Sequence, residues 1–211
     1  MSRKQMGKLY TICEWIMKLA YINLLWILFI GSGLVLFGFM PATVAMFAVV
    51  RKWFRKETEI PIWKTFVSVY KSELLTSNIY GLVFVVAGAM IYLDYYLILN
   101  LDGVIRIVAT SILLLISCLY LITLLFFFPV YVHYQLKFMG YLKYSFFLGV
   151  LNIHILLLVV LGLAADTFLL LYIPGLLPFF SGVSVACILM SSSILIFQRL
   201  QKQEMNKAIT E

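Results

Sequence analysis

Long apolar runs separated by short charged segments are the main pattern of this chain. Asp, Glu, Lys and Arg are absent from residues 19–50, 74–93, 107–136, 144–165 and 167–198. Each run is longer than the minimum length of a membrane-crossing helix, which is about 18 residues. The pattern therefore predicts an all-α protein whose helices cross a membrane.

The first run is long enough for two helices, and turn residues divide it. Three glycines precede Pro41: Gly31, Gly33 and Gly38. Proline favours the first turn of a helix, so we predict spans at 16–37 and 41–54, with Pro41 opening the second span after a tight turn at Gly38–Met40. At 1.5 Å per residue the second span is only about 21 Å long, so it must thin the bilayer or be sheltered by other helices.

Basic residues decide the number of crossings. Four lie before the first span and six in residues 51–73, followed by one at Arg106, two at Lys137 and Lys143, and three after residue 198. With six crossings and a cytoplasmic N-terminus, 15 of the 16 basic residues face the cytoplasm, as the positive-inside rule requires. Five crossings divide them 11 to 5. We therefore predict six spans, the last from about residue 177 to 200, with both termini cytoplasmic.

The segment before the third span has a helical pattern of its own. Apolar residues align on one face: Ile62, Phe66, Tyr70 and Leu74. Lys64 and Lys71 lie on the other face, which predicts an interfacial amphipathic helix over 62–74 within a basic cytoplasmic loop at 51–73. The chain is thus expected to be one integral membrane domain, residues 1–211, built as a polytopic six-helix bundle.

Composition excludes a water-soluble globule. Hydrophobic residues make up 64% of the chain and charged residues 12%, against about 45–50% and about 25% in average soluble domains. The three cysteines, Cys13, Cys118 and Cys187, lack the paired spacing of zinc or redox sites. We expect them to be small buried hydrophobic residues.

The densest run of positive charge is Arg51-Lys52-Trp53-Phe54-Arg55-Lys56, called the basic cluster below. One interpretation is an anchor on anionic lipid, where each cation near the surface contributes about 1 kcal/mol. The other is a docking surface for a partner, since Arg and aromatic residues dominate interface hot spots. Its candidate residues are Arg51, Lys52, Trp53, Arg55 and Lys56. We expect no nucleic-acid partner, because Trp and Phe at a membrane exit fit the headgroup region better.

Polar side chains inside the spans form a second candidate site, a buried polar layer. Its members are Asn23, Asn78, Asn152, His154 and Ser192. Counting from the nearest charged residue places the three asparagines about 7 to 14 Å inside the cytoplasmic boundary. We favour hydrogen bonds that hold the helices together, because polar groups in lipid need partners. The alternative is a pocket for a polar solute.

Catalytic constellations are missing from the sequence. His133 and His154 are 21 residues apart, no carboxylate falls in the middle of a predicted span, and no phosphate-binding glycine loop occurs. We therefore expect no enzyme activity, no cofactor and no metal site. The lack of charged residues within the spans also argues against ion-coupled transport.

Several motifs in the first half of the chain carry a family resemblance. They are Cys13-Glu14-Trp15-Ile16, Asn23-Leu24-Leu25-Trp26, Gly38-Phe39-Met40-Pro41-Ala42-Thr43, Arg51-Lys52-Trp53, Thr65-Phe66, Tyr70-Lys71, Ser77-Asn78 and Gly81. Together they resemble the YesL-like family of bacterial integral membrane proteins, also described as domain of unknown function 624. The specific likeness covers about residues 7–95; beyond that it is mostly hydropathy.

The resemblance implies a setting and no established activity. Members of that family are often encoded beside carbohydrate ABC transporters and sugar-responsive regulators in Gram-positive bacteria. We therefore expect a non-enzymatic accessory or subunit of carbohydrate uptake in a bacterial cell membrane, with lipid and ABC-type sugar transporter components as partners. The alternative is a small permease that moves a neutral polar solute along the buried amides.

Overall fold

The computed structural model describes the main chain of residues 3–210 and the side chains of residues 10–200 and Lys202. Its elements are α1 (Arg3–Ser32), α2 (Leu36–Phe54), α3 (Ile62–Ile98), α4 (Gly103–His133), α5 (Phe138–Leu151), α6 (Ile153–Tyr172), the 3₁₀ helix η1 (Pro174–Leu176) and α7 (Leu177–Thr210). No strand occurs in this described part of the chain. Six of its helices are long and apolar enough to cross a membrane, which confirms the expected polytopic all-α architecture.

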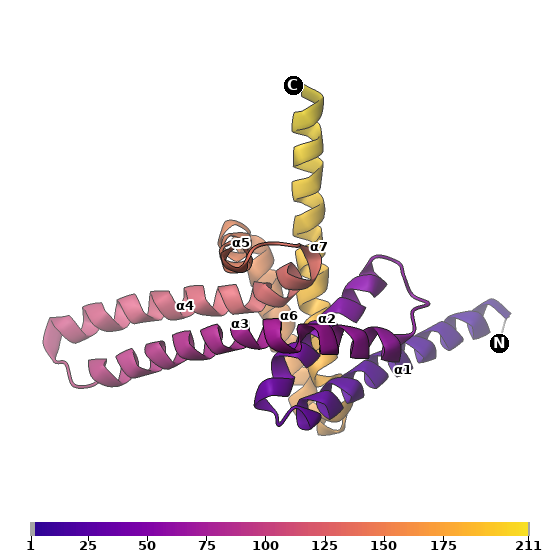
Figure 1. Cartoon of the computed structure of the whole chain (residues 1–211), viewed down its shortest axis with the longest axis horizontal. Coiled ribbons are helices and arrows are strands. Elements are labelled where there is room, and N and C mark those ends of the chain that lie inside the picture. Colours follow the sequence, from indigo (N-terminus) through magenta and orange to yellow (C-terminus); the bar gives the residue numbers. More distant parts are fainter. Residues whose placement is uncertain (1–2, 211) are drawn as a thin grey trace.

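The helices run in different directions. α3 and α4 pack side by side as a long hairpin that extends to one side of the molecule, and α7 runs crosswise to it (Figure 1). Side chains along the far half of the hairpin are exposed, including Leu93, Val104 and Leu114. Exposed apolar side chains of this kind suit contact with lipid tails.

α2 is the central helix of the structure. It contacts α1, α3, α4 and α7. Of the residues in its most apolar 18-residue segment, 67% are buried, against 39% or less in the other candidate spans. Small residues such as Ala42 and Ala45, both fully buried, let its neighbours approach closely. The expected sheltering is therefore present. The expected shortness is wrong, because α2 has 19 residues, or about 28 Å of helix.

The turn between α1 and α2 lies five residues earlier than predicted, at 33–35. Leu34 and Val35 adopt positive φ angles of 55° and 65°, which is unusual for residues with a Cβ. Pro41 is the sixth residue of α2 and does not open it. The glycines serve close packing instead: a Cβ on Gly33 would collide with the main chain of Gly38.

The segment 62–74 is amphipathic as predicted, but it is not a separate helix. α3 continues through it for 37 residues, from Ile62 to Ile98. Phe66 and Tyr70 are buried against α1, where both rings contact Phe29, whereas Lys64 and Lys71 are exposed. No proline or glycine occurs between Ile62 and Tyr80, so nothing ends the helix at the expected boundary.

The fourth apolar run, predicted as one helix over 144–165, is divided between α5 and α6. Asn152 separates them with φ −117° and ψ 50°, outside the helical region. α6 then continues to Tyr172, so the connection before α7 is shorter than the predicted segment from Asp166 to Pro178. The start of α7 at Leu177 agrees with the prediction.

The cysteines are less buried than expected. Cys13 in α1 and Cys118 in α4 are exposed, and Cys187 in α7 is half-buried. All three are free thiols. Cys13 and Cys118 therefore lie on the outer surface of the bundle and not in its core.

Candidate functional site

The ends of α2 and α4 and the second half of α7 line an open cavity of about 530 Å³, called the basic pocket below. It is lined by Arg51, Phe54, Arg55, Lys56, His133, Ile194, Phe197 and Gln198. The first four residues belong to the end of α2 and its cap, His133 ends α4, and the last three belong to α7. Helices far apart in the sequence thus bring three cationic side chains and one imidazole together: Arg51, Arg55, Lys56 and His133.

A Schellman-type cap ends α2 at the wall of the basic pocket. The amide of Glu57 donates to the carbonyl of Lys52, and the amide of Lys56 donates to the carbonyl of Trp53, both at 3.0 Å. Lys56 holds the left-handed position of this cap, with φ 67°. Glycine is the usual residue there, because it has no Cβ to oppose the left-handed conformation.

Two nitrogen atoms of the pocket-lining residues are buried without a hydrogen-bond partner in the described part of the chain. They are Nε of Arg51 and Nδ1 of His133. The His133 ring stacks on Phe197 with its centroid 4.2 Å away, which holds the imidazole against α7. No described carboxylate forms an ion pair with Arg51, Arg55 or Lys56.

The residues of the basic cluster differ in their exposure to solvent. Arg55 and Lys56 are exposed, and Arg51 and Lys52 are half-buried. Trp53 is only 7% exposed and packs edge-on against Trp15 at 5.5 Å. The prediction that Trp53 belongs to a docking surface is therefore wrong, because its ring fills the contact between α1 and α2.

Asn23 is the most completely bonded of the predicted polar residues. It is fully buried, and its Nδ2 donates to the carbonyl of Pro178 at 2.9 Å. Its Oδ1 accepts from the amides of Gly182 and Val183 at 2.9 and 3.0 Å. One side chain of α1 thus satisfies three main-chain groups in the first two turns of α7.

Asn78 binds a different helix. Its Nδ2 donates to the carbonyl of Phe37 in α2 at 2.9 Å and to the carbonyl of Leu74 in its own helix at 2.6 Å. Phe37 lies four residues before Pro41, which has no N–H to give it. Asn78 therefore supplies the donor that the proline lacks.

The remaining members do not complete one polar layer. Asn152 donates to the carbonyl of Leu148 in the preceding turn, at 2.9 Å. His154 is exposed and its Nε2 lies 3.2 Å from Nη1 of Arg199. Ser192 is half-buried, whereas its neighbour Ser193 is fully buried. The expectation of a single layer is corrected, because the three asparagines bind main-chain groups of four helices: Asn23 binds α7, Asn78 binds α2 and α3, and Asn152 binds α5.

One polar pair inside the bundle was missed by the sequence reasoning. The Tyr131 hydroxyl donates to Oε2 of Glu73 at 2.6 Å, joining α4 to α3. The rings of Tyr80 and Tyr141 pack against Tyr131. Glu73 lies 11 residues after the start of α3, in the segment that the sequence analysis assigned to the cytoplasmic loop at 51–73. The signal available was the amphipathic pattern that continues without a break into the apolar run.

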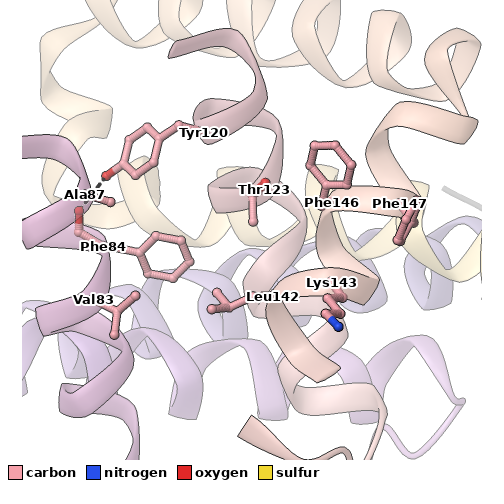
Figure 2. Close-up of a pocket in the computed structure, with 9 residues that line it drawn as sticks. All are labelled: Val83, Phe84, Ala87, Tyr120, Thr123, Leu142, Lys143, Phe146 and Phe147. Atoms are coloured by element: carbon pink, nitrogen blue, oxygen red, sulfur yellow. Dashed lines mark hydrogen bonds between the residues drawn. The ribbon is translucent and has the colours of Figure 1, made fainter. Parts of the chain in front are cut away.

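A second cavity of about 340 Å³ lies between α3, α4 and α5 (Figure 2). It is lined by Val83, Phe84, Ala87, Tyr120, Thr123, Leu142, Lys143, Phe146 and Phe147. The Tyr120 hydroxyl donates to the carbonyl of Phe84 at 3.1 Å, and the Thr123 hydroxyl donates to the carbonyl of Leu119 at 2.8 Å. Because these hydroxyl protons are already engaged, the cavity suits apolar chains better than polar solutes.

Metal-binding geometry is missing from the described residues, where no three His, Cys, Asp or Glu side chains come together. The polar side chains that line the basic pocket are two guanidinium groups, one ammonium group, one imidazole and the amide of Gln198. Such a set attracts anions, since guanidinium and ammonium groups donate hydrogen bonds and accept none.

Comparison with known proteins gives consistent matches. The family model described as "Protein of unknown function, DUF624" matches residues 19–95. Three curated proteins of Bacillus subtilis strain 168, each named as uncharacterized, are similar over most of their length. YteU is 40% identical over 83% of this chain and 79% of its own. YesL is 36% identical over 93% of both chains. YesV is 35% identical over 92% of this chain and 94% of its own. No solved structure matches the chain significantly.

Proposed function

Because the chain belongs to the YesL-like family of proteins of unknown function, DUF624, we propose its role from its structure. The proposed role is that of a non-enzymatic accessory protein in the membrane. It binds to a carbohydrate uptake system through the exposed end of α2. The observation that carries this proposal is the cationic surface formed by Arg55 and Lys56, which no described carboxylate neutralises by an ion pair.

The proposed occupant of this surface is an acidic cytoplasmic segment of an ABC-type sugar transporter subunit. Phe54 is 43% exposed beside Arg55 and Lys56. An aromatic ring next to cations is the combination that protein interfaces favour. The carbohydrate setting is the one that the family resemblance implies.

The proposed location is a bacterial cell membrane, with both termini in the cytoplasm. The ends of α2 and α4 and the end of the apolar part of α7 line one pocket, as expected if the second, fourth and sixth spans run in the same direction. Lys18, at the middle of α1, pairs with Glu59 in the loop after α2, at 3.3 Å, which fits a shared side for the first half of α1 and this loop. The side chains of Arg3, Lys4, Lys8 and Lys207, which contribute to the charge argument, lie outside the described residues.

Cross-linking in native membranes tests the docking proposal. The charge-reversed variant Arg55→Glu/Lys56→Glu should lose a cross-linked transporter subunit that the unchanged chain retains. Lys64→Glu/Lys71→Glu is the matched control, because both lysines are exposed on α3 outside the basic cluster. Recovery of a single unassociated species that moves sugar in liposomes would overturn the proposal.

A small permease is the second candidate, and one observation favours it. Glu73 is a half-buried carboxylate within a candidate span, and ionisable residues in such places often mark transport paths. Asn23 and Asn78 argue against it, since their donors are engaged by main-chain carbonyls. Sugar flux in liposomes that depends on Glu73, tested with Glu73→Gln, would favour the permease.

A further inference from the structure

We propose that the basic pocket binds a phosphate group, carried either by a lipid headgroup or by a free phosphorylated solute. The inference goes beyond docking and does not depend on it, because it requires His133 and the wall of α7, which lie outside the basic cluster. The structural basis is the convergence of Arg51, Arg55, Lys56 and His133 on one cavity.

The charge of the pocket is suited to phosphate. Three side chains carry fixed positive charge, and Glu57, the acidic residue next to Lys56, forms no ion pair with them. A phosphate ester offers several acceptor oxygens and up to two negative charges, whereas a carboxylate offers two oxygens and one charge. Guanidinium groups recognise phosphate with paired, parallel hydrogen bonds.

Unpartnered buried nitrogens provide a second line of support. Nε of Arg51 is a donor, and Nδ1 of His133 donates or accepts according to the tautomer of the ring. Both are covered from solvent and have no hydrogen-bond partner in the described part of the chain. Buried donors without partners are uncommon and call for an explanation such as an absent ion. Both residues line the cavity, so their unpartnered nitrogens lie beside the space that an anion would occupy.

The conformation of Lys56 is a third and independent observation. A lysine in the left-handed position strains the main chain, and such strain tends to collect at functional sites. The cap itself needs no side chain at this position, because its hydrogen bonds are made by main-chain groups. We infer that the ammonium group of Lys56 is kept for the ligand.

The size of the cavity indicates more than an inorganic ion. Its volume of about 530 Å³ falls within the range of about 300 to 1,000 Å³ typical of small-molecule sites. Phe54, Ile194 and Phe197 form apolar walls beside the cationic groups. A phosphate monoester or diester with an organic substituent fits this mixture.

The test measures binding to the purified full chain in a neutral detergent. One arm titrates inorganic phosphate by calorimetry, with sodium chloride at matched ionic strength as the reference. The other arm adds phosphatidylglycerol or phosphatidylcholine and counts retained lipids by native mass spectrometry. Saturable phosphate binding indicates a soluble phosphorylated ligand, and selective retention of phosphatidylglycerol indicates a lipid headgroup. Failure of both arms overturns the proposal, while leaving the docking proposal untouched.

Variants separate the pocket from general charge. Lys56→Gly removes the ammonium group and relieves the strain, so the protein should stay folded while its affinity falls about tenfold or more. His133→Gln should weaken binding in the same direction. Lys64→Gln removes one exposed positive charge outside the pocket and should leave affinity unchanged. Equal affinity in Lys56→Gly and the unchanged chain would overturn the proposal.

Discussion

The side-chain amide of Asn78 in α3 donates a hydrogen bond of 2.9 Å to the main-chain carbonyl of Phe37 in α2. In a regular helix the amide of residue 41 would donate to that carbonyl, but residue 41 is proline. A proline inside a helix is thus compensated by a side chain from the next helix. The bond also fixes α3 against the central helix at this level.

We expect the effects of Asn78 and Pro41 substitutions to be coupled. Asn78→Leu should cost about 1 to 3 kcal/mol, because it leaves the Phe37 carbonyl without a donor in an apolar medium. In a Pro41→Ala background the restored amide can donate to Phe37, so the same change should cost only a few tenths of a kcal/mol. A double-mutant cycle of unfolding free energies in detergent measures the difference. Additive costs would show that Asn78 does not replace the proline's missing donor.

Asn23 should be more sensitive to substitution than an exposed asparagine that binds only a carbonyl four residues earlier in the chain. Asn23→Leu removes the partner of three main-chain groups in α7, and we expect a loss of about 1 to 3 kcal/mol. Asn100→Leu is the control, since that side chain is exposed in the turn after α3 and donates only to the nearby carbonyl of Tyr96. Thermal unfolding in detergent provides the comparison. Equal effects would mean that α7 closes its own hydrogen bonds when Asn23 is removed.

Gly38, three residues after the first turn, should not tolerate a methyl group. A Cβ on Gly38 would lie 2.6 Å from the carbonyl oxygen of Phe29 and 2.7 Å from that of Ile30. Gly38→Ala should therefore cost about 1 to 3 kcal/mol through overpacking. Gly31→Ala is the matched control, because a Cβ there meets no atom within 4 Å. A Gly38→Ala protein as stable as Gly31→Ala would contradict the close approach of α1 and α2.

The spans were predictable and the first turn was not. Uninterrupted apolar runs identify helices that cross a membrane, because the main chain must satisfy its own hydrogen bonds there. Gly33, Gly38 and Pro41 also carry a strong turn signal, yet the structure uses the two glycines for close packing and bends at Leu34 and Val35. A sequence gives the turn propensity of each residue and not the atoms that approach it.

Of the five residues predicted to form the buried polar layer, Asn23 alone is fully buried, and the five do not form one group. Counting residues from the nearest charge assumes that every helix crosses the membrane in parallel from a common boundary. α3 instead begins at Ile62 and runs crosswise to α7 (Figure 1). Asn78 binds the carbonyl of Phe37 at the start of α2. The basic pocket depends on His133 and Phe197 meeting the end of α2. No local sequence pattern connects these three segments.

The last prediction concerns the pair of Tyr131 and Glu73, whose atoms Oη and Oε2 are 2.6 Å apart. Tyr131→Phe should cost about 1.5 to 3 kcal/mol, because hydrogen bonds to charged groups are stronger than neutral ones and Glu73 is half-buried. Replacing both partners with apolar side chains, as in Glu73→Leu/Tyr131→Phe, should cost less than Tyr131→Phe alone, since no buried polar group then lacks its partner. Thermal unfolding in detergent measures all three proteins. Tyr96→Phe provides the control, because Tyr96 is an exposed tyrosine near the end of α3. If Tyr131→Phe is as mild as Tyr96→Phe, the carboxylate of Glu73 finds another donor, and the Tyr131 bond does not hold α3 and α4 together.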